Sequence, residues 1–519
     1  MVRAGLGKWL QRAAAAILRT PRLGFASSAV SIPSISAPAW AVELSPTSWG
    51  HGVRTFAPHR RGRNGATVAP GPSKGPNDGV SGGPRPRGGR LLSDGVHPRA
   101  VVSAQTPTGD EALARRLGLG DAVVIGLGSM VGAGVFAVWA PASAAAGTGL
   151  LLGLLLAALV AFCNATSTAQ LAARYPTSGG AYVYGREVLG PWPGFFAGWA
   201  FVVGKIASSA AMALTFAAYV APDAWQKPVA AIAVAVIAVV NSRGVSRTAG
   251  LARLPVAVSL AGLAVVSVVG FGHADPSALS SGAPVTATGV LQSAGFLFFA
   301  FAGYARIATM GEEVSEPERT IPRAVTTALA IVLSVYLTVG ASALVSLGPA
   351  ALAASPAPLA DVAAASGMAW PVLATRIGAA GAALGALLAM IAGIGRTSLA
   401  MARTGDLPGW LAAVHPRYRV PHRAELVVGV VVCVLVLATD LRGAIGFSSF
   451  GVLLYYLVAN VAALRQGGAP RGRWRTLAVA GAAGCLLLTA TLPWQSVVSG
   501  LVVIAAGLVY RLVVLRLRS

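Results

Sequence analysis

Two stretches of small residues inside apolar segments could expose backbone amides and carbonyls for binding a solute. The first, GLGSMVGAGVF at 126–136, contains four glycines, and the second, FFAFAGYAR at 298–306, places a glycine among aromatic residues. Glycine lets a helix unwind in the middle of a membrane, where freed amides and carbonyls can face a solute. Close helix packing is the other common reason for glycine in a membrane helix, and it explains either stretch taken alone.

The groups that unwinding would free suit an α-amino acid, which carries a carboxylate and an ammonium on one carbon. Amides at the broken end of the first helix would direct a positive dipole at the carboxylate. Carbonyls in both stretches would accept hydrogen bonds from the ammonium, so no charged side chain is required. The predicted substrate-binding residues are Met130, Gly132, Ala133, Gly134, Phe299, Ala302, Gly303 and Tyr304.

The composition predicts the helices that would hold these groups. Of the 519 residues, 55% are hydrophobic and only 11% are charged, against about a quarter in ordinary soluble domains. Apolar runs of roughly 17–25 residues recur along the chain, each long enough to cross the hydrocarbon as a helix. We therefore expect an all-α polytopic membrane protein of about twelve spans, near 119–141, 147–172, 192–221, 228–241, 251–271, 287–310, 324–347, 371–400, 424–439, 443–464, 475–492 and 495–515.

The two glycine stretches fall in the first and the sixth expected spans, at corresponding places of a five-plus-five repeat. Paired interruptions of this kind are typical of inverted-repeat transporters, which bind their solute near the midplane where the broken helices meet. The pairing favours an interrupted, solute-facing backbone over a role in packing alone.

The net charge of +23 is distributed as in a membrane protein and does not indicate a nucleic-acid partner. Residues 1–110 are rich in Pro, Gly and Arg without a spanning run, which predicts a disordered basic extension or a mis-assigned start. Arginines in alternate loops predict a multi-pass protein of the plasma membrane with both termini cytoplasmic. The three cysteines lie in apolar runs, so we expect neither a disulfide nor a metal site, and no cofactor.

Four ordered motifs resemble the amino acid–polyamine–organocation (APC) permease superfamily. They are the stretch at 128–136, YPTSGGAYVY at 175–184, EEVSEPERTIPRA at 312–324, and RTGDLP at 403–408 with VPHRA at 420–424. The resemblance implies a LeuT-like fold in which helices 1–5 and 6–10 are inverted repeats. It divides the chain into a permease core at 111–465 and helices 11–12 with a short basic C-terminus at 466–519. It also implies alternating access around a central amino-acid site.

Departures from the superfamily pattern bear on coupling. Proton-coupled relatives can carry a lysine in helix 5, but LPVAVSL at 254–260 contains none, and Ala133 stands where many relatives have serine. Lys205 lies deep in the third span, and a charge there normally faces a cavity. Lys205 is therefore a coupling candidate that could load a proton or act as a fixed cation, with a structural or snorkelling lysine as the alternative. Arg306, with Glu312 or Glu313 as its partner, is a gating candidate.

These observations predict a secondary active transporter of amino acids that works by alternating access. A cationic side chain would find no deep Asp or Glu, so a neutral amino acid is expected, with protons as the coupling ion. The alternatives are an exchanger, including one for cationic amino acids or polyamines, and a membrane amino-acid sensor that does not transport. No convergent set of catalytic side chains predicts an enzyme.

Overall fold

The computed structural model describes residues 117–175, 179–244, 249–282, 284–310, 313–466 and 472–518, with the backbone alone over 249–253. The extension predicted over 1–110 lies outside the described residues, and so does Glu312. Within the described residues the chain forms helices and 3₁₀ turns, and no strand longer than the single bridge between Leu117 and Val314.

The spanning helices of the first half run in alternating directions between the two ends of the helical bundle. A short helix, α6, joins the second and third spans. The elements of this half are α2 (Leu119–Met130), α3 (Ala133–Ala137), α4 (Trp139–Ala146), η1 (Gly147–Gly149), α5 (Leu150–Arg174), α6 (Gly180–Leu189), α7 (Pro191–Val220), η2 (Asp223–Trp225), α8 (Gln226–Ser242) and α9 (Ala249–Gly272).

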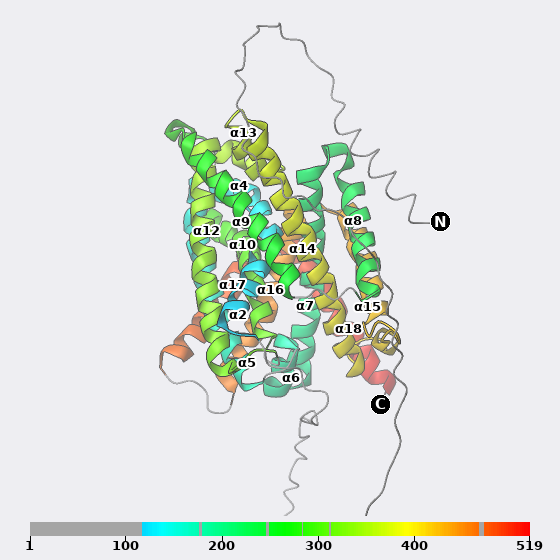
Figure 1. Cartoon of the computed structure of the whole chain (residues 1–519). Helices are drawn as coiled ribbons and strands as arrows, with labels where there is room; N and C mark the ends of the chain where they lie inside the picture. Colours follow the sequence, from blue (N-terminus) through cyan, green and yellow to red (C-terminus); the bar gives the residue numbers. More distant parts are fainter. Residues whose placement is uncertain are drawn as a thin grey trace, which may run out of the picture. The chain divides into compact units, whose positions relative to one another are not determined.

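The second half repeats the pattern and adds two helices. It contains η3 (Pro276–Ser280), α10 (Ala287–Phe301), η4 (Ala302–Tyr304), α11 (Ala305–Ala308), α12 (Pro317–Ala354), α13 (Pro358–Ala364), α14 (Ala369–Arg403), η5 (Gly409–Ala412), α15 (His422–Ala438), α16 (Leu441–Arg465), α17 (Arg473–Thr491) and α18 (Trp494–Arg518). Figure 1 shows α13 at one end of the bundle and α6 at the other, and these ends are called the α13 end and the α6 end below.

The expected number of spans agrees closely with the structure. Eleven segments of the described residues are long and apolar enough to cross a membrane. The remaining expected span, 424–439, is α15, which has 17 residues and so lies at the lower limit of about 17–25 for a spanning helix. The all-α polytopic fold predicted from hydropathy is thus confirmed.

The packing contacts are symmetric between the two halves: where two of these helices pack together, their counterparts in the other half also pack together. The second, third and fourth spans (α5, α7, α8) pack on their counterparts α12, α14 and α15. The first and sixth spans (α2, α10) and the fifth and tenth spans (α9, α16) are also counterparts. Accordingly, α7 packs on α16 and α14 packs on α9, and α2 packs on α12 and α10 packs on α5. Such reciprocal packing is what an internal repeat produces, and it agrees with the expected five-plus-five arrangement.

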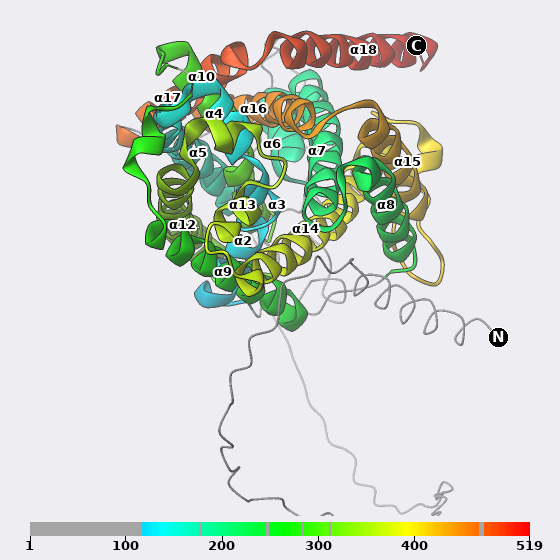
Figure 2. The same ribbon diagram turned by 90° about the horizontal axis from the view of Figure 1, so that it is seen from above.

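The two interrupted helices lie inside this arrangement. Seen from the α13 end, α2 and α3 are surrounded by α5, α12, α9, α14, α7 and α16 (Figure 2). Small residues allow the surrounding helices to approach closely: a Cβ on Gly451 of α16 would lie 2.7 Å from Gly204 Cα of α7. The close α7–α16 contact fixes one wall of the space that the broken helices face.

Candidate binding site

The first span is broken where the glycine stretch predicts. α2 ends at Met130, and Val131 (ψ 45°) and Gly132 (ψ −147°) leave the helical conformation before α3 begins at Ala133. Val138 stays in the right-handed helical region and donates to Gly134 O, so α3 and α4 form one nearly continuous helix from residue 133 to 146. The first amides of this helix have no carbonyl partner within it, because their acceptors would belong to the broken link.

The sixth span is interrupted more gently. α10 ends at Phe301, one 3₁₀ turn follows as η4, and α11 continues from Ala305. Phe301, Ala302, Tyr304 and Ala305 keep helical dihedral angles, with Ala302 at φ −61°, ψ −4°. The sequence predicts an unwound segment here, whereas the structure has a tightened turn, which is a common form of mid-helix interruption at functional hinges.

The two interruptions touch each other. A Cβ on Gly303 would lie 2.2 Å from Ser129 O, and one on Gly134 would lie 2.8 Å from Ala300 Cα. No side chain fits at either position without a shift of backbone. These glycines therefore serve both purposes considered from the sequence, the interruption of a helix and close helix packing, because the helices pack closely at the same place where they are broken.

Two tyrosines bind the carbonyls at the breaks. Tyr336 Oη of α12 donates to Met130 O at 2.7 Å and also lies 3.2 Å from Ala300 O. Tyr456 Oη of α16 donates to Ala302 O at 3.3 Å. Neither tyrosine is among the residues predicted from the sequence, although a phenol hydroxyl deep in an apolar span is a signal that a buried partner is present.

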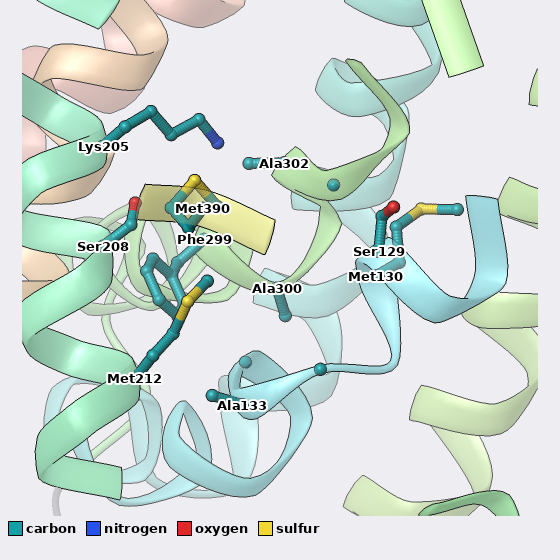
Figure 3. Close-up of a pocket in the computed structure, with 13 residues that line it drawn as sticks. Ser129, Met130, Ala133, Lys205, Ser208, Met212, Phe299, Ala300, Ala302 and Met390 are labelled. Atoms are coloured by element: carbon teal, nitrogen blue, oxygen red, sulfur yellow. The ribbon is translucent and has the colours of Figure 1, made fainter. Parts of the chain in front are cut away.

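A small cavity lies between the two breaks, with α7 and α14 completing its walls (Figure 3). Its volume is about 20 Å³, room for roughly one water molecule. An amino acid therefore needs the lining side chains or the helices to move apart. The lining residues are Ser129, Met130, Gly132, Ala133, Gly134, Lys205, Ser208, Met212, Phe299, Ala300, Ala302, Gly303 and Met390.

Seven of the eight predicted binding residues line this cavity, and Tyr304 does not. The Tyr304 ring is fully buried and stacks on Tyr456 with centroids 5.0 Å apart, on the far side of the η4 turn. If the segment had been unwound, as predicted, the side chain of Tyr304 could have reached the solute. The 3₁₀ turn keeps successive side chains about a third of a turn apart, and this turns the phenol toward α16.

Lys205 lines the cavity from α7. Its residue is 5% exposed, and Figure 3 shows the side chain extended across the cavity toward Ala302. Among the described residues Lys205 Nζ makes no hydrogen bond or ion pair. One turn further along α7, Ser208 Oγ lies 2.6 Å from Ser448 Oγ of α16. The cavity thus contains one cationic group and, among its lining residues, no carboxylate.

Arg306 lies outside the cavity. It is exposed, and its Nη1 lies 3.5 Å from Thr309 Oγ1. The charges of Arg396 and Glu313 are close enough to interact electrostatically with its guanidinium. Glu312, the other predicted partner, is outside the described residues. In the part of the chain that the structure describes, no group of three His, Cys, Asp or Glu side chains could hold a metal ion, and the three cysteines are free.

Comparison with known proteins agrees with this geometry. A family model described as amino acid permease matches residues 117–515. The chain belongs to this amino acid permease family, part of the APC superfamily. Membership implies a LeuT-like fold, in keeping with the interrupted first and sixth helices and the reciprocal packing, and it makes the chain a multi-pass integral membrane protein.

The permease has relatives in bacteria and plants. An uncharacterized transporter of Mycobacterium tuberculosis is 56% identical over 405 residues, covering 76% of this chain and 90% of the relative. The chloroplastic cationic amino acid transporter 6 of Arabidopsis thaliana is 30% identical, covering 75% and 72%. A branched-chain amino acid permease of Bacillus subtilis is 26% identical, covering 78% and 93%. All three are transporters by name.

Proposed function

We propose that this permease is a secondary active transporter that carries an amino acid across the bilayer by alternating access. The observation that carries the proposal is the cavity between the two helix breaks, lined by backbone that regular helices would not offer. Irregular backbone at membrane depth is tolerated where it is buried or lines a solute cavity, which supports a binding role for these breaks.

The amino-acid head groups would bind to backbone atoms. The amides of Gly132, Ala133 and Gly134 begin the α3–α4 helix, whose positive dipole end attracts a carboxylate. The carbonyls of Met130 and Ala302 each have a second lone pair beyond the tyrosine hydrogen bond, so each can accept from the ammonium. This arrangement recognises what all α-amino acids share.

The side chain of the substrate is expected to carry no positive charge. A cationic side chain would meet Lys205 in a cavity that has no carboxylate among its lining residues. Relatives named for branched-chain and for cationic amino acids differ in their side chains, so their names support the shared head groups only. The sequence predicts a neutral side chain, and the Met212, Phe299 and Met390 side chains supply apolar contacts for one.

Proton coupling is the proposed energy source, with exchange as the rival. Lys205 is the titratable group that faces the cavity, so it can gain or lose a proton as the site changes its exposure. A proton carried on Lys205 with the substrate would link uptake to the pH gradient.

Reconstitution tests the proposal and separates the rivals. The purified full chain in sealed liposomes is offered a panel of labelled amino acids, with and without a pH gradient, and with or without unlabelled amino acid inside. Accumulation driven by the gradient supports proton coupling, whereas flux that needs an internal amino acid means exchange. Binding without any flux would contradict transport and favour a sensor.

A further inference from the structure

We infer that the preferred substrate is an acidic amino acid, whose side chain carries a second carboxylate that pairs with Lys205. This inference rests on the proposed transport function and narrows it. It takes the place of the neutral side chain predicted from the sequence, because the sequence could not show whether Lys205 faces lipid, protein or the cavity.

The lining has two anion-attracting groups and one set of cation-attracting groups. The amides that begin at Ala133 and the ammonium of Lys205 lie on opposite sides of the cavity in Figure 3. Between them lie the helix ends at Met130 and Ala302, whose carbonyls are the proposed acceptors for the substrate ammonium. A molecule with one ammonium and two carboxylates matches this order, with its α-carboxylate at the amides and its side-chain carboxylate at Lys205.

The balance of charge favours the same substrate. Lys205 is nearly fully buried at membrane depth, has no ion-pair partner among the described residues, and shares its cavity with no Asp or Glu. A neutral amino acid is a zwitterion and would leave the charge of the Lys205 ammonium uncompensated. An acidic amino acid brings one further negative charge, so the loaded site has no net charge, and a buried charge is stabilised when it is paired.

The alternative is that Lys205 is a structural cation held by carbonyls at the C-terminal end of α10. Cations are favoured near helix C-termini, and the side chain does extend toward Ala302. That role, however, does not require the ammonium to face the cavity. It predicts that replacing Lys205 changes the stability of the protein and leaves the order of substrates unchanged.

The experiment compares substrates and variants in proteoliposomes made with the full chain. Labelled L-glutamate, L-aspartate, L-leucine and L-lysine are offered under an inward pH gradient. We expect uptake of L-glutamate or L-aspartate to exceed that of the other two. Uptake of L-leucine or L-lysine alone would overturn this inference and leave the proposed function standing, whereas no uptake of any amino acid would count against the proposed function itself.

Variants then test the role of Lys205. The variants are compared with no pH gradient imposed, so that the proposed proton coupling through Lys205 does not enter the measurement. Under these conditions Lys205→Met should lower the uptake of acidic amino acids by about tenfold to a hundredfold, the usual effect of removing a charge-assisted hydrogen bond, and change L-leucine uptake much less. Lys227→Met is the matched control, since Lys227 is exposed at the start of α8 and, among the residues that the structure describes, its ammonium donates to Leu437 O alone. An equal loss for all substrates in Lys205→Met would overturn the inference.

A binding measurement on the unmodified protein keeps the inference testable if Lys205→Met does not fold. L-glutamate should raise the melting temperature of the detergent-solubilised chain in a concentration-dependent way, because a ligand that binds only the folded state stabilises it. L-leucine should do so only at higher concentration. Stabilisation by L-leucine at lower concentration than L-glutamate would overturn the inference.

Discussion

At the scale of single residues, Tyr336 joins the two broken helices. Its hydroxyl contacts Met130 O of the first helix and Ala300 O of the sixth, and its ring packs 5.2 Å from that of Phe301. Met130 and Ala300 both line the cavity, and a single hydroxyl in contact with both of their carbonyl oxygens fixes the separation of the two breaks there. Tyr336 is therefore a positioning residue for the proposed substrate site.

Tyr336→Phe removes the hydroxyl and keeps the ring packing. We expect the KM for the transported amino acid to rise about tenfold, equivalent to about 1.4 kcal/mol, with a smaller change in the maximal rate. Uptake kinetics in proteoliposomes measure both quantities. If the variant melts at a lower temperature yet keeps its KM, the hydroxyl only stabilises the fold and the positioning role is wrong.

A second cluster, outside the cavity, is centred on Asp406 in the segment between α14 and η5. Its carboxylate accepts hydrogen bonds from Tyr182 Oη at 2.8 Å, Arg186 Nη1 at 3.1 Å and Arg511 Nη1 at 2.8 Å. Arg511 also lies over the ring of Phe195, 4.7 Å from its centroid. Burial raises the pKa of Tyr182, and the nearby carboxylate raises it further, so the phenol stays a proton donor. The cluster ties α6, α7 and α18 to the end of α14.

Asp406→Asn should destabilise the protein strongly, because it leaves the buried guanidinium of Arg511 without its counter-ion. Breaking a buried ion pair in this way costs about 3–5 kcal/mol. Thermal unfolding in detergent measures the effect. Glu316→Gln is the matched control: Glu316 pairs with Arg319 at 3.6 Å, both side chains are about three-quarters exposed, and such pairs contribute little. Equal melting temperatures for both variants would contradict the prediction.

The sequence could predict Lys205 and the glycines of the cavity, but it could not predict the Asp406 cluster. Lys205 and the glycines identify themselves, since a charge or a weak helix former inside an apolar run is unusual. The Asp406 cluster depends on partners far apart in the chain, with Arg186 and Arg511 on opposite sides of it in sequence. Arginines near helix ends are common, so nothing local distinguishes these two from the others. Tyr336 did offer a local signal, a phenol hydroxyl deep in an apolar span, but its two carbonyl partners lie 206 and 36 residues away, so the sequence could not identify them.

At the scale of elements, the contact between the helix breaks depends on glycine. Gly303→Ala would place its methyl group against Ser129 O and Met130 N, at 2.2 and 2.8 Å. These are backbone atoms, so the helices themselves must separate. We expect the variant to lose at least about tenfold in uptake and about 1–3 kcal/mol in stability, as is usual for overpacking.

Gly381→Ala in α14 is the control for that change, because a Cβ there meets no atom within 4 Å. Alanine favours a helix over glycine by roughly 0.5–1 kcal/mol, so this variant should melt slightly higher and transport normally. Uptake and melting temperature are measured together for both variants. Normal uptake in Gly303→Ala would show that the close contact between the breaks is not needed for transport.

The two breaks also mark how far sequence reasoning extends at this scale. Glycine spacing predicted where each helix is interrupted, since glycine lowers helix stability wherever it occurs. The form of the interruption was not predictable, because Val131–Gly132 leaves the helix while Ala302–Tyr304 tightens into a 3₁₀ turn. That choice depends on Tyr456 and on the packing of α16, which are contributed from elsewhere in the chain.

At the scale of the whole molecule, the two ends of the helical bundle differ in charge. Exposed tryptophans mark both ends, with Trp225, Trp370 and Trp494 at the α13 end and Trp192, Trp410 and Trp474 at the α6 end. Aromatic belts of this kind lie at the two membrane–water interfaces. The basic residues are concentrated at one of them: the α13 end carries Lys227, Arg376 and Arg442, whereas the α6 end carries Arg174, Arg186, Arg243, Arg319, Arg323, Arg403, Arg417, Arg419, Arg423, Arg465, Arg473, Arg475, Arg516 and Arg518.

We propose from this asymmetry that the α6 end faces the cytoplasm, with both termini on that side and the protein in the plasma membrane. Arginine and lysine in short loops resist translocation, which orients the chain during insertion. Substrate released toward the α6 end would therefore enter the cell, as uptake requires.

Single cysteines test this orientation. In a variant with Cys163, Cys433 and Cys485 replaced by alanine, Ala274→Cys adds a thiol at the α13 end and Val414→Cys adds one at the α6 end, both at exposed positions. A membrane-impermeant maleimide should label Ala274→Cys in intact cells, and Val414→Cys only after the membrane is permeabilised. Because both sites are exposed, the difference in labelling reports the side of the membrane. The reverse result would invert the topology, and the α6 end would then be the side from which substrate is taken.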